Sequence, residues 1–240
     1  MNIIRLKDGR ERSLLRRHPW IFDGAIASGS ADSGETVRVE SHSGQFLGWA
    51  AFSPTSKIRA RVWSFTEAQK IDAAFFAARI AQAISARSRF DIQSDGLRLI
   101  HGESDGLPGL VVDRYGDTLV AQFSSCGSEK WKKVIVTELL AQTGLTRLYE
   151  RSDASVRSLE GLPEATGWLA GAGDTGIVIT EHDWKLSLDV AEGQVTALLG
   201  ANGAGKTTTL RALCQLMVQT TGSITLDGVA LNSRNTEQIA

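Results

Sequence analysis

The sequence predicts an α+β multidomain fold: a small β-barrel, then a central α/β domain, then a truncated strand–P-loop–helix–strand fragment. Three observations support this. Short alternating strands with Gly and Pro between them fill about residues 1–70. An Ala-rich helical stretch followed by several strands fills about residues 71–189. The run Gly200–Thr207 has the spacing G-x4-G-K-T of a phosphate-binding loop within residues 190–240.

In the first block, residues 35–40, 45–52 and 57–63 read as strands, with Gly44 and Pro54 in the turns. Alternation along the last of these strands places three cations on one face and three apolar residues on the other. The cations are Lys57, Arg59 and Arg61, and the apolar residues are Ile58, Ala60 and Val62. Because large aromatic residues in strands usually pack, we expect Trp49 and Trp63 in the core.

Positive charge is concentrated at the start of the chain, where six Lys and Arg precede Pro19. Such a cluster is typical of a surface that binds a polyanion, although a solvated face has the same composition. The aromatic residues His18, Trp20 and Phe22 follow it and favour RNA, whose bases can stack on rings. The candidate RNA-binding residues are Lys7, Arg10, Arg12, Arg16, Arg17, His18, Lys57, Arg59 and Arg61.

In the middle block, residues 71–84 and 130–142 have helical patterns, and the second pattern ends at Gly144. The predicted strands are residues 98–100, 110–112, 118–123 and 148–151. The polar segment from His101 to Gly106 resembles an active-site loop in composition. Its Gly and Pro content fits a hairpin connection better, so we expect a structural role.

The phosphate-binding loop follows a predicted buried strand at residues 195–199 and precedes a predicted helix at residues 208–217. Backbone amides of such a loop converge on phosphate oxygens, and its lysine reaches the outer phosphates. The candidate nucleotide-binding residues are Gly200, Asn202, Gly203, Gly205, Lys206, Thr207 and Thr208. The Thr207 hydroxyl would ligand Mg²⁺ if ATP binds. Only Asp227 and Glu237 are acidic downstream of Lys206, so we predict no hydrolytic machinery.

Residues 186–240 resemble the N-terminal part of an ABC transporter ATP-binding domain, and the wording GANGAGKTTTLRA is similar to the branched-chain amino-acid type. The matching pieces are the strand before the loop, the loop itself and residues 222–228. The signature, acidic Walker B strand and switch histidine of that family have no counterpart in this sequence. The resemblance therefore implies a nucleotide site without ATPase activity.

Residues 1–190 resemble ribosomal RNA large subunit methyltransferase I. The matching pieces are residues 7–22, 34–37, 53–63, 98–116, 149–153 and 181–182. The resemblance implies an RNA-binding PUA domain over residues 1–70 and the family's central domain over residues 71–189. That family methylates a ribosomal cytosine with S-adenosylmethionine (SAM). The P-loop sequence begins where its SAM domain would follow, so we expect neither SAM binding nor methyl transfer.

The composition is that of an ordinary soluble protein, without an apolar run long enough to span a bilayer. The N-terminus lacks a secretory signal and the two cysteines indicate no disulfide framework, so we expect a cytoplasmic chain. The favoured hypothesis is an RNA-binding protein, with ribosomal RNA as its partner. The alternatives are an ATP-binding protein that uses the PUA domain for targeting, and a recombined or truncated chimera without activity.

Overall fold

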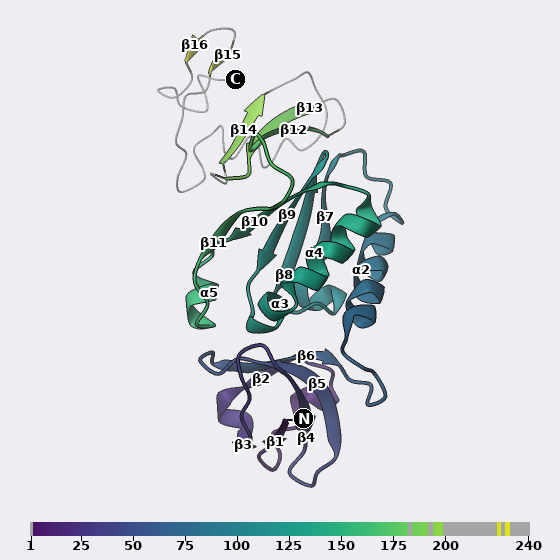
Figure 1. Cartoon of the computed structure of the whole chain (residues 1–240), viewed down its shortest axis with the longest axis vertical. Coiled ribbons are helices and arrows are strands. Elements are labelled where there is room, and N and C mark those ends of the chain that lie inside the picture. The colour runs from purple at the N-terminus through teal and green to yellow at the C-terminus, as the bar shows by residue number, and fades with distance from the viewer. Residues whose placement is uncertain (1, 182–183, 192–193, 199–224, 227–228, 231–240) are drawn as a thin grey trace, which may run out of the picture.

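The computed structural model describes residues 2–181, 184–191, 194–198, 225–226 and 229–230. Three sheets follow one another along the long axis of the molecule, and the helices lie mainly on the middle one (Figure 1). A two-stranded ribbon of β15 (Thr225–Leu226) and β16 (Val229–Ala230) lies near the C-terminal end. The predicted mixed fold of α and β elements is confirmed.

The N-terminal domain is a six-stranded sheet in the order β2-β6-β5-β4-β1-β3. Its strands are β1 (Ile3–Leu6), β2 (Trp20–Phe22), β3 (Ile26–Ser28), β4 (Thr36–Glu40), β5 (Phe46–Phe52) and β6 (Ile58–Ser64). Helix α1 (Arg12–Leu15) lies between β1 and β2, and the 3₁₀ turn η1 (Asp23–Ala25) joins the edge strands β2 and β3. The sheet curves around an apolar core (Figure 1).

The three strands predicted in this domain are confirmed as β4, β5 and β6. Gly44 has a φ of +86°, which explains why glycine stands in the turn between β4 and β5. Trp63 is buried as predicted. Trp49 is half-buried instead, and its indole N–H donates to the Glu67 carbonyl at 3.0 Å.

The central domain is a five-stranded sheet in the order β11-β10-β9-β8-β7, in which only β9 and β10 are parallel. Its strands are β7 (Gly96–His101), β8 (Leu110–Tyr115), β9 (Thr118–Phe123), β10 (Arg147–Ser152) and β11 (Ala165–Ala170). The shorter elements are η2 (Gly102–Asp105), α3 (Cys126–Lys130) and α5 (Val156–Leu159).

Two helices cover one face of this sheet, namely α2 (Ala73–Arg87) and α4 (Lys132–Thr143) (Figure 1). The Asp72 side chain accepts a hydrogen bond from the Phe75 amide at 3.1 Å and so caps α2. Helix α4 ends at Gly144, whose φ of +68° provides the left-handed cap that the sequence predicted. Both predicted helices are confirmed.

A three-stranded antiparallel sheet packs on the opposite face, built from β12 (Gly176–Glu181), β13 (Trp184–Asp189) and β14 (Gln194–Leu198). Ile177 and Ile179 of β12 lie in one apolar cluster with Tyr149 of β10. Strand β14 confirms the predicted strand before the P-loop. The P-loop and the helix predicted after it lie outside the described residues.

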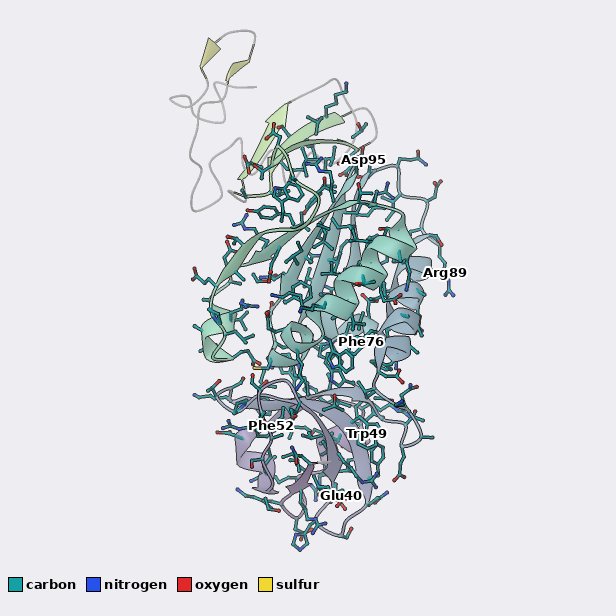
Figure 2. The ribbon with its side chains drawn as sticks, in the orientation of Figure 1. Glu40, Trp49, Phe52, Phe76, Arg89 and Asp95 are labelled. Carbon is teal, nitrogen blue, oxygen red and sulfur yellow. The ribbon has the colours of Figure 1, made fainter. Side chains whose placement is uncertain are left out.

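The N-terminal and central domains share a core. Ala51 of β5 and Trp63 of β6 belong to the same buried cluster as Phe75 and Phe76 of α2. Figure 2 shows Phe76 at the end of the central domain that faces the N-terminal sheet. The apolar contact fixes the two domains relative to one another, and hence fixes any surface that both of them line.

Candidate nucleic-acid interface

A run of exposed cations follows the chain from the end of β1 to the start of β2. Its members are Lys7, Arg10, Arg12, Arg16 and Arg17, and Lys57 before β6 is exposed as well. The His18 ring, which follows them, is also exposed, and its Nδ1 accepts a hydrogen bond from the Trp20 amide. Among the described residues none of these seven side chains takes part in a salt bridge. The charges of the six Lys and Arg side chains are therefore available to phosphate groups.

Other cations of the same domain are engaged with carboxylates. Arg5 and Arg38 each lie 2.9 Å from Glu40, and their hydrogen bonds lower the pKa of that carboxyl. Glu40 is located at the end of the N-terminal domain remote from the central sheet (Figure 2).

The three cations predicted to share one face of β6 have different surroundings. Lys57 is exposed, whereas Arg59 is half-buried and its guanidinium donates to the carbonyls of Ser53 and Pro54. Arg61 is only 6% exposed and lies 2.7 Å from the Glu160 carboxylate, just after α5. Because its charge is neutralised by Glu160 at the contact between the domains, we exclude Arg61 from the proposed RNA surface.

Glu160 is the centre of a buried polar cluster at this domain contact. It is 2% exposed, and its carboxylate accepts hydrogen bonds from Arg61, from the Ser53 hydroxyl at 2.7 Å and from the Cys126 amide at 3.3 Å. Burial raises the pKa of Glu160, but the charge of Arg61 and the serine hydrogen bonds outweigh it, so the pKa lies below its ordinary value. The carboxylate is therefore ionised at neutral pH and functions as a structural counterion.

A second contact joins the domains beside the cations. The Trp20 indole N–H donates to the Glu103 carboxylate of η2 at 2.7 Å. The ring of Trp20 meets His18 and Phe22 edge-on, with ring centroids at 5.7 and 6.5 Å. His18, which precedes β2, and Trp20 and Phe22 of β2 therefore form one aromatic row, which we call the aromatic ladder.

A shallow cavity of about 240 Å³ lies on the face of the central sheet next to β13. Two ion pairs line it. Arg98 lies 2.8 Å from Asp113, and Arg151 lies 3.0 Å from Asp153. The Asp189 carboxylate also lines the cavity, so two arginines and three aspartates surround it and the lining does not favour an anionic ligand.

The segment from His101 to Gly106 has the structural role predicted for it. It forms η2 in the hairpin between β7 and β8, and Gly106 has a φ of +68°. Asp105 accepts two hydrogen bonds from Arg87 and one from the His101 amide. The Asp105 carboxylate is therefore engaged in hydrogen bonds that hold the hairpin and α2 together.

The described part of the chain contains no cluster of His, Cys, Asp or Glu suited to a metal ion. Burial raises the pKa of the Cys126 thiol, which argues against a reactive thiolate. The candidate nucleotide-binding residues 200–208, including the proposed Mg²⁺ ligand Thr207, lie outside the described residues. Where the structure describes the chain, no helix has the length and apolar composition needed to cross a bilayer.

Sequence reasoning missed two features of this site. Glu160 lies in a polar stretch 99 residues from Arg61, and nothing in the local pattern pairs them. Arg17 has a φ of +61°, the only such value for a residue other than glycine in the described ranges. The second feature had no strong signal, because many helices end without a left-handed residue and residues 12–17 contain no glycine to mark one.

Two protein-family models match the chain. The PUA-like domain family matches residues 4–65, and the ABC transporter family matches residues 184–240. Ribosomal RNA large subunit methyltransferase I of Shewanella frigidimarina is 46% identical over 200 residues, covering 80% of this chain and 50% of that protein. The enzyme of the same name from Shigella flexneri is 45% identical over 198 residues, with the same coverage.

The chain resembles ribosomal RNA large subunit methyltransferase I. Both resemblances inferred from the sequence are confirmed, and the N-terminal domain is PUA-like. The chain spans about half the length of the curated methyltransferases that it matches.

Solved structures agree on the fold. A protein of Streptococcus mutans described as a SAM-dependent methyltransferase superposes with a TM-score of 0.68 at 16% identity, covering 90% of this chain and 54% of that one. A methyltransferase structure in complex with SAH gives a TM-score of 0.69 at 16% identity, covering 83% of this chain and 50% of that one. At this identity the likeness concerns the fold alone.

Proposed function

We propose that this protein binds RNA through its PUA-like domain and that its target is ribosomal RNA. The observation that supports the proposal is the run of exposed cations without a carboxylate partner from Lys7 to Arg17, joined by Lys57. Neutralising phosphates releases counterions from the nucleic acid, and such cations supply most of the affinity. The ribosomal target is inferred from the names of the curated relatives.

The test is the salt dependence of binding. Fluorescence anisotropy of the full chain with a labelled single-stranded RNA should give an affinity that falls as salt rises. The logarithm of the binding constant falls linearly with the logarithm of the salt concentration. Replacing Arg16 and Arg17 by Ala should reduce the magnitude of that slope by about 1.4, because each phosphate contact on single strands contributes about 0.7. The control Lys133→Ala removes an exposed cation from α4 and should leave the slope unchanged. An equal slope in all three proteins would exclude the two arginines from the interface.

The sequence analysis expects no SAM binding, but the relatives and solved structures are named as methyltransferases. SAM is therefore a cofactor to test. One candidate element among the described residues is already engaged in hydrogen bonds. The strand–turn–helix element at β9 and α3 has its amides occupied, since Ser125 and Ser128 form a capping box and the Cys126 amide donates to Glu160. We therefore assign no methyl-transfer step to this element. Calorimetric titration of the full chain with SAM tests binding directly.

A second candidate function is nucleotide binding by residues 200–208. The match of the ABC transporter family to residues 184–240 supports it. Lys206 would contact the outer phosphates of ATP, and Thr207 would hold Mg²⁺. Titration with a fluorescent ATP analogue should give saturable binding that Lys206→Ala abolishes. Equal signals from the two proteins would remove this candidate.

A further inference from the structure

The conformation of Arg17 is unusual for its position. The His18 amide donates to the Ser13 carbonyl at 2.9 Å, and the Arg17 amide donates to the Leu14 carbonyl at 2.8 Å. These two bonds form a Schellman motif at the end of α1, with Arg17 at the left-handed position that glycine normally occupies. A side chain there is strained, and such strain is concentrated at functional sites.

The strained residue directly precedes the first ring of the aromatic ladder in the sequence. The Arg17 guanidinium lies over the Phe65 ring, 5.6 Å from its centroid, and this contact holds the side chain at the surface. His18, the first ring of the ladder, is the next residue. Arg16 is exposed on the other side of Arg17. Two cations therefore precede a row of three rings along one edge of the sheet.

The ladder presents its rings to solvent and is held in place from behind. Ile21, between Trp20 and Phe22, is buried in the domain core, so the rings point away from that core. Phe22 is 49% exposed and His18 is exposed, while Trp20 is half-buried. The hydrogen bond from Trp20 to Glu103 fixes the middle ring against the central domain. The edge-on contact with Trp20 leaves about half of Phe22 exposed to solvent, so its ring face can receive a base.

We propose that Arg16, Arg17 and the aromatic ladder form a binding site for unpaired nucleotides, with bases stacked on His18 and Phe22 and phosphates held by the two arginines. This inference rests on the proposed RNA-binding function and specifies its substrate class. Bases of an A-form duplex are stacked on one another and are inaccessible to the rings, whereas loops and single strands present free bases. The site therefore selects single-stranded RNA over duplex RNA.

The test compares Phe22→Leu with Phe22→Tyr in the full chain, using labelled single-stranded and duplex RNA of equal length. Leu keeps an apolar side chain but removes the ring, and Tyr keeps the ring. One stacked base contributes roughly a fivefold affinity or more, so Phe22→Leu should lose about that factor on single strands, and Phe22→Tyr should retain it. The salt slope should stay unchanged in both variants. Leu15→Ala, which changes an apolar residue 62% exposed beside Arg16, is the control.

A second variant separates a binding role for Arg17 from a folding role. Arg17→Gly relieves the left-handed strain, so its urea midpoint should rise while its affinity for single-stranded RNA and its salt slope fall. A lower midpoint, or unchanged affinity, would overturn the assignment of Arg17. If binding depends on Arg16 and Arg17 but is unaffected by Phe22→Leu and equal on duplexes, base stacking is excluded while the proposed function stands. Absence of RNA binding would reject both.

Discussion

At the scale of single residues, the least replaceable side chain is Glu160. Arg61 is buried against it, and a buried charge that loses its counterion is far more costly than a surface charge. The other groups that touch the carboxylate, Ser53 and the Cys126 amide, are neutral. Glu160 is therefore the only partner of full opposite charge within 3 Å of Arg61 in the described chain, since Glu103 lies 3.9 Å away.

We predict that Glu160→Gln lowers the free energy of unfolding by about 3–5 kcal/mol, the usual cost of breaking a buried pair on one side. Urea unfolding at neutral pH measures it. Glu67→Gln is the matched control, because Glu67 pairs with Arg38 at the surface and should contribute no more than about 1 kcal/mol. Equal losses in the two variants would contradict the role assigned to Glu160.

The same pair also predicts a pH dependence. The folded pKa of Glu160 lies below its ordinary value of 4.5, so the carboxylate stabilises the fold above that value. This contribution is lost as the pH falls from about 4.5 through the lowered pKa of the folded state. The stability difference between the native chain and Glu160→Gln should therefore shrink in that range. A difference that is constant from neutral pH downward would count against the ionised pair.

At the scale of elements, helix α3 packs closely on the N-terminal sheet because residue 127 has no side chain. A Cβ on Gly127 would lie 2.4 Å from the Ala51 Cβ and 2.6 Å from the Trp63 ring. Helix propensity alone favours Gly127→Ala by about 1 kcal/mol. The overlap involves a buried strand and a buried ring that cannot move aside, so we predict instead a loss of about 1–3 kcal/mol.

Thermal unfolding of Gly127→Ala tests which effect is larger. Gly24→Ala is the control, since the new methyl group there meets nothing within 4 Å and should change stability by less than about 0.5 kcal/mol. A stabilised Gly127→Ala variant would show that the helix can move away from the sheet.

The bounds of the helices and strands could largely be predicted from the sequence, whereas the contacts between domains could not. Strand β9 has the bounds predicted from its pattern, and α4 ends at the predicted glycine, because local propensity and capping are encoded in neighbouring residues. The alternation of Lys57, Arg59 and Arg61 predicted their common face but not their partners. Arg61 meets a residue almost 100 positions away, and such contacts depend on how domains dock rather than on local pattern.

At the scale of the whole molecule, we predict that the N-terminal and central domains unfold as one cooperative unit. Ala51 and Trp63 complete the buried cluster of the central domain, and the Arg61–Glu160 pair closes the same contact. Among the residues whose burial the structure describes, the cluster between the third sheet and the central sheet has four buried members, Tyr149, Ile177, Ile179 and Val190. Since local stability follows buried apolar contact, the first two units should open together and the third should open earlier.

Native-state hydrogen exchange in low urea measures this order. Amides of β5 and β6 should lose protection at the same urea concentration as those of β8 and β9, while amides of β12 exchange first. In Glu160→Gln the first two groups should shift together, because each depends on the shared core. Separate transitions for β5–β6 and β8–β9 would mean that the domains fold independently. The aromatic ladder would then lose the fixed support of Glu103, and its rings could no longer be presented to RNA in one orientation.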